Sequence, residues 1–481
     1  MLDFIVKELN PFTKLRTPWA VLLALLCFTL LCSFFLKKPC IDLPWGGTQR
    51  NEYRTLCYND IEALYGVRKL NVRAFPYVTE KSYEYPVIIG LTMWTASLFA
   101  NNFTQFFIAT LPFLSAAALL TLLGLIGAIG SRPRVLFYAL APPLFLYAFH
   151  NWDLLAVAPL ALAMWAWKEK KETLAGIGLG VGAAAKLFPG FFVPVLMVAA
   201  LKSKEPQHSP ESWKNVLLGA VGAYAAINLP IIVADWFLNN QVNGWLNVFL
   251  FHSHRLPDFG TIWYWLPDKF VGDNLSLAWR FVPALMIAAT TGAAVLFTRI
   301  YIGREHERPV AILGGALTVF TGLVMSLPAM NNGSTSQEYK QLVDGFSFLI
   351  FACGTGALLV YQWRRNREPW PIAGAIIALF LIVAKVHSPQ YALWLLPFFV
   401  ILPTPVWLIL SYYLTDLLLL VGNWFWVGYS DHMESNGWQT LYISCIFFRA
   451  ALLALLIIWY VLKAPDLVSE QRRTELGKQL A

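Results

Sequence analysis

Charged side chains are scarce in this chain. Asp, Glu, Lys and Arg make up 13% of its 481 residues, whereas 58% are hydrophobic. Because soluble domains carry about 25% charged residues, this composition excludes an ordinary water-soluble enzyme. Apolar runs of about 20 residues recur along the chain and predict transmembrane helices. We therefore expect an all-α polytopic integral membrane protein with about 12–14 transmembrane helices.

Cysteine is also rare, with six residues in the chain. No two of them have the spacing Cys-x-x-Cys, so a structural zinc site is not expected. Cys40 and Cys57 flank the first polar loop. They can form a disulfide if that loop faces an oxidising compartment, and otherwise they remain free thiols. The sequence leaves both alternatives open.

The positions of the basic residues predict how the chain crosses the membrane. Lys7, Lys14 and Arg16 precede the first apolar run, 17–36, and no small-residue cleavage site follows, so this run resembles an uncleaved anchor. Basic residues of short loops lie mainly on the cytoplasmic side, and placing both termini there satisfies this rule. The net charge of +8 then reflects cytoplasmic loops rather than nucleic-acid binding. The clusters placed inside are 131–134, 168–172, 202–214, 299–308, 364–367 and 463–478.

This assignment divides the chain into five parts. They are a cytoplasmic N-terminus (1–16), a first module of spans (17–235) that includes an extracytoplasmic loop (37–102), a second large extracytoplasmic loop (236–276), a variable C-terminal module of spans (277–462) and a cytoplasmic tail (463–481). We expect an interfacial helix at 85–101, because a crossing there would place the basic cluster 131–134 outside. We also expect a span at 134–150. Two short spans within 173–201 would have Lys186 at their outer turn.

With this topology, the unusual polar residues collect on the extracytoplasmic side. Each has an ordinary explanation when taken alone. Asp60 can be a solvated loop carboxylate, Asp153 can cap a helix, and Lys186 can snorkel to the interface. Their gathering on one side favours a functional site over these separate explanations. The set comprises Asp60 and Glu84 in the first loop, Asp153 in the second, Lys186 in the third, His252, His254 and Arg255 in the fourth, and Lys385, His387 and Gln390 at a late turn.

These residue types together indicate a kind of chemistry. Lysine, arginine and histidine donate hydrogen bonds and bring positive charge to a phosphate, and a carboxylate can take a proton from a hydroxyl. A phosphate leaves readily when its developing charge is stabilised. No cluster of carboxylates indicates Mg²⁺ or Mn²⁺, so we expect neither a metal nor a cofactor. The pattern predicts group transfer from a lipid phosphate to a hydroxyl at the membrane surface.

Six short strings follow one another along most of the chain. They are Cys57-Tyr-Asn-Asp60, Phe75-Pro-Tyr77, Glu84-Tyr-Pro86, Asn151-Trp-Asp153, Ala185-Lys-Leu-Phe-Pro189 and Ser388-Pro-Gln-Tyr391. Through these strings the chain resembles the GT-C glycosyltransferases that use polyprenyl-phosphate sugars. Among them it is most similar to the bacterial polyprenyl-phosphate-mannose α-mannosyltransferases, of the phosphatidylinositol-mannoside mannosyltransferase type.

The resemblance implies a function for each candidate residue. Asp60 would be the general base of a metal-independent transfer that inverts the sugar carbon. The donor phosphate would be bound by Lys186, Arg255, His387 and His254. Other substrate contacts would come from Asn59, Glu84, Asp153, Gln390 and Tyr391. The partners would be a polyprenyl-phosphate sugar, a glycolipid or cell-envelope glycan acceptor and membrane lipids, but no nucleic acid. The active site would face the extracytoplasmic side of the plasma membrane.

Two alternatives remain. Mannose is inherited from the resemblance, and arabinofuranose on the same kind of lipid carrier is the alternative sugar. A lipid or sugar transporter, or a flippase, is the alternative class of protein. Transporters usually show inverted repeats and polar groups near the bilayer midplane, whereas this chain shows no convincing internal repeat and its polar groups collect at one face. The sequence therefore favours an enzyme.

Overall fold

A computed structural model gives the fold of the chain. It describes residues 16–42, 50–202, 211–270, 282–301, 337–430 and 436–469, with single residues or pairs between 304 and 319. The predicted cytoplasmic N-terminus, apart from Arg16, and the end of the predicted tail, 470–481, lie outside the described residues. Parts of both predicted extracytoplasmic loops, 43–49 and 271–276, also lie outside them.

Within the described residues, six helices are long and apolar enough to cross a membrane. They are α2 (Trp19–Asp42), α6 (Phe103–Ile129), α12 (Ser212–Asn239), α18 (Gln337–Arg365), α21 (Val406–Tyr429) and α22 (Gly437–Leu462). Large apolar side chains cover their outer surfaces, and Phe237 and Leu218 of α12 are 80% and 68% exposed. Such continuous apolar surface requires lipid around it. The prediction of an all-α multi-pass membrane protein is confirmed.

Several further helices complete the bundle. The helices α10 (Glu172–Ala185) and α11 (Val193–Lys202) are joined by Lys186 and the 3₁₀ turn η4 (Phe188–Phe192). This arrangement matches the two short helices and intervening lysine predicted for this stretch. The other helices are α5 (Val87–Ser97), α9 (Leu154–Lys168), α16 (Val282–Tyr301), α19 (Pro369–Val383) and α20 (Leu396–Ile401), the last preceded by the 3₁₀ turn η7 (Pro389–Leu395).

The predicted span at 134–150 is not a single helix. The chain forms two short helices there, α7 (Leu136–Ala139) and α8 (Pro142–Tyr147). Two adjacent prolines begin α8, and they have no backbone N–H with which to continue α7. Ala141, which precedes them, is driven to an extended conformation with φ −64° and ψ 126°. The break sends the turn after α8 back into the bundle.

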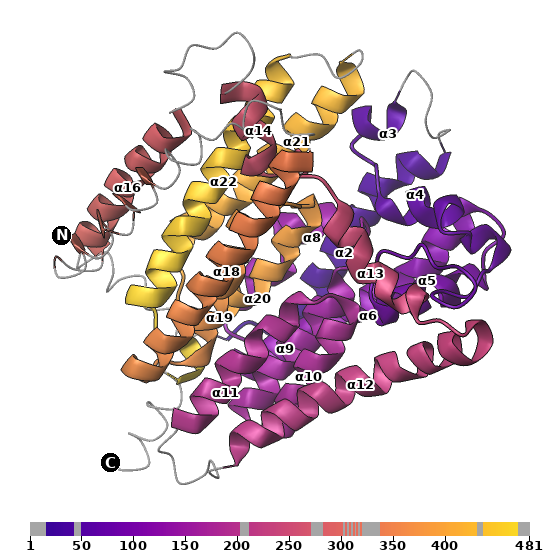
Figure 1. Ribbon diagram of the computed structural model, residues 1–481, viewed down its shortest axis with the longest axis horizontal. Helices are drawn as coiled ribbons and strands as arrows, with labels where there is room; N and C mark the ends of the chain where they lie inside the picture. The colour runs from indigo at the N-terminus through magenta and orange to yellow at the C-terminus, as the bar shows by residue number, and fades with distance from the viewer. Residues whose placement is uncertain are drawn as a thin grey trace.

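Close packing of the helices holds the bundle together. In Figure 1, α10 lies between α9 and α12, and α22 lies against α19 and α21. A Cβ atom on Gly180 of α10 would lie only 2.2 Å from the carbonyl oxygen of Ala220 in α12. Only glycine therefore allows these two backbones to approach so closely. Small residues at helix contacts are typical of proteins packed within membranes.

The first polar loop folds into short helices beside the end of α2. They are α3 (Asn51–Arg54) and α4 (Asp60–Val67), followed by α5. With 11 residues, α5 is about 16 Å long and cannot cross a hydrocarbon core of about 30 Å, in agreement with the interfacial helix predicted there. A disulfide joins Cys40 of α2 to Cys57, the first of the two alternatives left open by the sequence.

The second large loop also contains short helices. They are α13 (Asn243–His254) and α14 (Ile262–Phe270). The loop is tied to the first loop, because the Asn247 side-chain amide donates to the carbonyl of Lys81 at 3.0 Å. It is tied to the C-terminal bundle by Trp263, whose indole N–H donates to the carbonyl of Val383 at 2.9 Å. The two loops therefore form one cap over the end of the bundle.

We expect Cys57→Ser to lower the free energy of unfolding by about 3 kcal/mol, because a cross-link over a loop of this length removes that much chain entropy from the unfolded state. Thermal unfolding of the purified protein in detergent measures the effect. Cys27→Ser removes an exposed thiol of α2 that is not bonded to another cysteine, so this control should leave Tm unchanged. Equal unfolding temperatures for wild type and Cys57→Ser would contradict the disulfide.

Candidate active site

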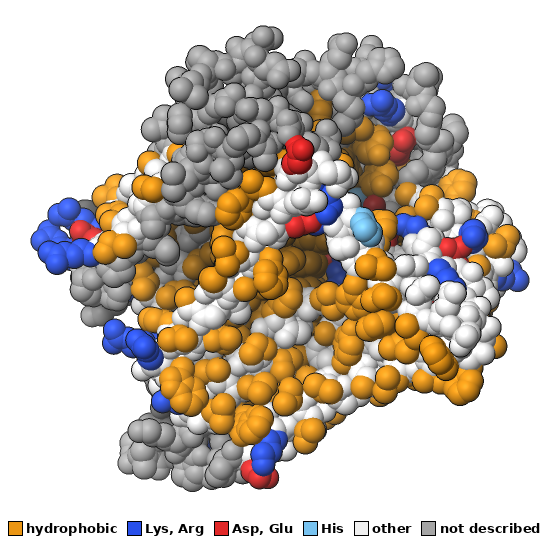
Figure 2. Space-filling view, in the orientation of Figure 1, with side chains coloured by type: hydrophobic (Ala, Val, Ile, Leu, Met, Phe, Trp, Pro, Cys, Tyr) orange, Lys and Arg blue, Asp and Glu red, His pale blue; other side chains and the backbone are white. Residues whose placement is uncertain are grey.

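Polar side chains gather around a hollow in one face of the molecule. Figure 2 shows this face hollowed between α18 and α13, with acidic, basic and histidine side chains near the rim. The elements that contribute come from distant parts of the sequence: the first loop, the turns after α8 and α10, the helix α13, and the turn before η7. Side-chain contacts described below join these elements to one another.

The start of α4 is fixed by its own side chains. Asn59 is the N-cap residue: its side-chain oxygen accepts from the backbone N–H of Glu62 at 2.9 Å, and its amide donates to the Glu62 carboxylate at 2.8 Å. The pair resembles a capping box, except that Glu62 accepts from the side-chain amide of Asn59 instead of its backbone N–H. Burial raises the pKa of Glu62 to about 7. We predicted a substrate contact for Asn59, but its side chain is fully buried and serves the helix start.

Asp60 is the first residue of α4, and it is only partly buried. Its Oδ2 accepts from the Asn151 amide at 2.6 Å and its Oδ1 accepts from the Tyr58 hydroxyl at 3.2 Å. Its backbone N–H donates to the carbonyl of His150 at 2.9 Å, which joins α4 to the turn after α8. Burial raises the pKa of Asp60, and the hydrogen bonds from Asn151 and Tyr58 oppose this rise. A fixed carboxylate with increased proton affinity suits a general base.

Lys186 and Asp153 form a buried ion pair beside this carboxylate. The Lys186 ammonium donates to both oxygens of Asp153 at 2.8 Å. The Trp394 indole donates to the same carboxylate at 2.7 Å. Asp153 is fully buried and makes no cap hydrogen bond to α9, so its partners are the lysine and the indole. Since an ammonium has three N–H donors, Lys186 keeps one donor beyond those that bond to Asp153.

Three aromatic rings surround the ammonium of Lys186. Its Nζ lies 5.6 Å from the ring centroid of Tyr85, 5.0 Å from that of Tyr391 and 5.6 Å from that of Trp394. Rings at these distances stabilise a cation. The rings of Tyr391 and Trp394 stack with centroids 4.0 Å apart. The hydroxyl of Tyr85 accepts from Asn151 at 2.8 Å. Tyr85 therefore contacts both Lys186 and Asn151, the residue that donates to Asp60.

Arginine and histidine side chains of the two loops have acidic or main-chain partners. Arg255 donates to Asp258 at 3.1 Å and stays partly exposed. Glu84 forms an ion pair with Arg68, and its main-chain carbonyl lies 2.9 Å from Nε2 of His252. Two predicted site residues, Arg255 and Glu84, therefore each have a partner of opposite charge. Each partner reduces the net charge that its residue offers to a ligand.

The remaining predicted residues lie deeper or farther out. His387 is 3% exposed, and its Nδ1 lies 3.1 Å from the carbonyl of Leu381, so Nδ1 is the donor. Burial, and then the charge of Arg449, lower the pKa of His387 well below its usual value. The neutral ring then offers Nε2 as an acceptor, which suits a hydroxyl better than the predicted phosphate. Gln390 is buried, with no partner for its Oε1 in the described part of the chain. His254 is exposed at the end of α13.

Sequence reasoning missed several residues of the site. Lys37 lies near the end of α2, fully buried, with its ammonium 3.1 Å from the carbonyl of Tyr58 and 4.8 Å from the ring centre of Trp424. Its positive charge acts on the carboxylates of Asp60 and Glu62. A lysine at the end of an apolar run was a visible signal, but such lysines usually snorkel to the interface. The other missed residues are Tyr85, Asn151, Trp394 and Arg68.

The bundle and its polar hollow define a multi-pass membrane protein with an enzyme-like site. The family model "Glycosyltransferase family 87" matches residues 83–327, half of the chain. The chain therefore belongs to glycosyltransferase family 87. The matched range includes Asp153, Lys186 and Arg255 but ends before His387 and begins after Asp60.

Two other comparisons were made with known proteins. None of the curated proteins matches the chain. Among solved structures, the chain is similar to the crystal structure of ArnT from Cupriavidus metallidurans bound to undecaprenyl phosphate. The sequence identity is 14%, the TM-score is 0.33, and the match covers 92% of this chain and 77% of the ArnT chain.

We expect Asn151→Ala to reduce kcat/KM by about 10- to 100-fold, because a hydrogen bond to a charged group is worth about 1.5–3 kcal/mol. The amide of Asn151 stabilises the ionised form of Asp60, so its loss raises the pKa of that carboxyl further. Since a base must be deprotonated, the acid limb of the pH–rate profile should move to higher pH. The profile of transfer rate against pH measures this.

The control for Asn151→Ala is Asn228→Ala. Asn228 is also a buried asparagine, and its side chain bonds to Tyr224 and Trp245, away from the site. This variant should leave the position of the acid limb unchanged. If the Asn151→Ala variant is active and its acid limb is unchanged, this result would contradict the contact between Asn151 and Asp60.

Proposed function

We propose that this family 87 glycosyltransferase moves a sugar, expected to be mannose, from a polyprenyl-phosphate donor to a hydroxyl of a lipid-linked or cell-envelope glycan acceptor. We propose Asp60 as the general base, a GT-C architecture and reaction with inversion, without a metal. The observation that supports this most is the setting of Asp60: it is partly exposed, held by two neutral donors, and within reach of the charge of a buried lysine. Family membership sets aside the alternative of a transporter.

The proposed reaction needs one proton acceptor and one stabilised leaving group. The Asp60 carboxylate takes the proton of the acceptor hydroxyl while the hydroxyl oxygen attacks the anomeric carbon opposite the phosphate. The bond from that carbon to the phosphate oxygen breaks, and its electron pair leaves with the polyprenyl phosphate. The β-linked sugar becomes an α-glycoside, and the proton remains on Asp60. No separate acid is needed because cations stabilise the leaving phosphate.

Two cations near the hollow are suited to the leaving phosphate. The ammonium of Lys186 has an N–H donor beyond the two contacts to Asp153. Arg255 keeps a partly exposed guanidinium beside its ion pair, and arginine binds phosphate in a bidentate manner. His387, in its neutral form, would instead accept from a sugar hydroxyl. Lys186, which is the more buried of the two, and Arg255 would thus contact different oxygens of the donor phosphate.

We expect Asp60→Asn to abolish transfer, with a loss of at least about 100-fold in kcat, because general base catalysis contributes about 10²–10⁴-fold. Donor binding should change little, since the substitution preserves shape. Transfer from polyprenyl-phosphate-mannose to a glycolipid acceptor, followed by linkage analysis of the product, measures the rate. Full activity of Asp60→Asn would remove this residue as the base.

Glu80→Gln is the matched control in the same loop. Glu80 is buried and paired with Lys69, so this variant should retain transfer. Repeating the wild-type assay with polyprenyl-phosphate-arabinofuranose decides between the two sugars. Transfer from a nucleotide sugar, with none from either lipid donor, would exclude the proposed donor class.

We also propose that both termini are cytoplasmic and that the hollow faces the extracytoplasmic side of the plasma membrane. The disulfide of the first loop supports this side, because disulfides persist in oxidising compartments. In a background with the other cysteines replaced, a membrane-impermeant thiol reagent should label Thr79→Cys in intact cells. It should not label Glu169→Cys, which is exposed at the other end of α9. The reverse pattern would invert the topology.

A further inference from the structure

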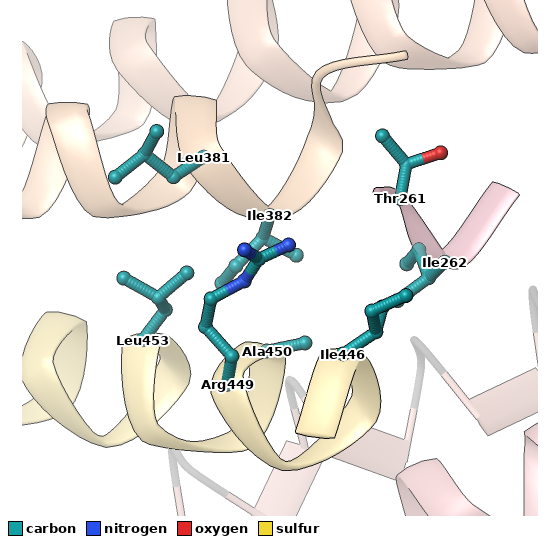
Figure 3. A pocket seen from close by; sticks show the side chains of 8 residues that line it. All are labelled: Thr261, Ile262, Leu381, Ile382, Ile446, Arg449, Ala450 and Leu453. Carbon is teal, nitrogen blue, oxygen red and sulfur yellow. The ribbon is translucent and has the colours of Figure 1, made fainter. Parts of the chain in front are cut away.

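Arg449 is a buried arginine in the C-terminal helix α22. It is 3% exposed and lines a small pocket together with Thr261 and Leu381. Figure 3 shows its guanidinium pointing away from α22 into the gap between the end of α19 and the start of α14. Aliphatic side chains form most of the other walls. An ionised side chain inside a membrane bundle is costly and usually has a functional partner.

Arg449 has a hydrogen-bond partner in the loop between α13 and α14, and its charge also acts on the buried carboxylate of Asp416 in α21. Its guanidinium donates to the carbonyl of Gly260 at 2.6 Å. The same turn is closed by Asp258, whose Oδ1 accepts from the Gly260 N–H at 2.8 Å and whose carbonyl accepts from the Thr261 hydroxyl at 2.7 Å. The arginine therefore holds a turn that is already ordered by its own hydrogen bonds.

This turn contacts the two segments that carry the proposed donor-binding residues Arg255 and His387. The carboxylate of Asp258 binds Arg255 at 3.1 Å, and its backbone N–H donates to the carbonyl of Lys385 at 2.8 Å. A Cβ atom on Gly260 would lie 2.4 Å from the carbonyl oxygen of His387. Only glycine therefore fits at position 260, between Arg449 and the turn that carries His387.

We propose that Arg449 is a positioning residue that fixes the turns carrying Arg255 and His387 in one arrangement. The proposal rests on the proposed function, in which these two residues bind the donor. Within the described residues, the hydrogen bond from Arg449 to this region goes to the carbonyl of Gly260, and its charge also acts on His387 and Asp258. Its effect would thus be on donor binding rather than on the proton transfer at Asp60.

The proposal predicts a separation of KM from kcat. We expect Arg449→Met to raise the donor KM at least tenfold and to change kcat less than threefold, because the base lies on another element. Binding of undecaprenyl phosphate to the purified full-length protein in detergent should weaken by a similar factor. Gly260→Ala leaves the arginine in place but displaces the same turn, and it should act in the same direction. Arg449→Lys, with a shorter reach, should be intermediate.

A double-mutant cycle tests whether Arg449 acts on donor binding through the turn that carries Arg255. In a background of Arg255→Met, the further substitution Arg449→Met should have a much smaller effect on binding than in wild type, because the two residues act through one turn. Arg134→Met is the matched control. Arg134 also donates to main-chain carbonyls, those of Phe399 and Leu402 at 2.7 and 2.6 Å, but it touches α20 and not the site. It should leave binding unchanged even if it lowers Tm.

Hydrogen exchange separates this inference from the proposed function. Arg449→Met should increase amide exchange in residues 255–261 and 384–388 together, and Arg134→Met should not. If wild type fails to bind undecaprenyl phosphate, the proposed function is wrong while exchange still decides whether the arginine holds the two turns. Unchanged exchange in both segments, or unchanged binding in Arg449→Met when wild type binds, would overturn the positioning function.

Discussion

The ion pair between Lys186 and Asp153 joins three elements from distant parts of the sequence: the turn after α8, the turn after α10, and η7 through Trp394. Removing one partner of a buried pair leaves an uncompensated charge, which costs about 3–5 kcal/mol. This interaction adds to the packing of the same elements, in which Phe188 stacks on Trp394 with ring centroids 4.2 Å apart. Tyr85 then links this pair to Asn151 and so to the first loop.

The proton affinity of the Asp60 carboxylate depends on how its neutral hydrogen-bond donors and the nearby cations are arranged. Two neutral groups, the amide of Asn151 and the hydroxyl of Tyr58, provide its direct hydrogen bonds. The cations Lys37 and Lys186 act on it through space rather than by contact. A direct ion pair would lower the proton affinity of a carboxylate by up to several pKa units. Fixing the group with neutral donors orients it while leaving it able to accept a proton.

The sequence predicted the class of fold well, because long apolar runs predict transmembrane helices and basic loops indicate the cytoplasmic side directly. It also placed Lys186 correctly at the turn between two short helices. It missed the pairing of Lys186 with Asp153, 33 residues apart, and of Asp153 with Trp394, 241 residues apart, because such contacts depend on tertiary packing. It also missed the break in 134–150, although two adjacent prolines marked it. The buried Lys37 looked like an ordinary interfacial lysine.

The unequal lengths of neighbouring helices have a consequence for the surrounding lipid. With 14 residues, α10 is about 21 Å long, whereas α12 beside it has 28 residues and is about 42 Å long. A helix longer than the hydrocarbon core tilts, and Figure 1 shows α12 running obliquely along the bundle. The short α10 instead ends inside the bundle, and Lys186 in the turn that follows it is 8% exposed. Protein rather than lipid therefore covers this polar turn, so the long α12 beside it sets the bilayer thickness that this side of the bundle requires.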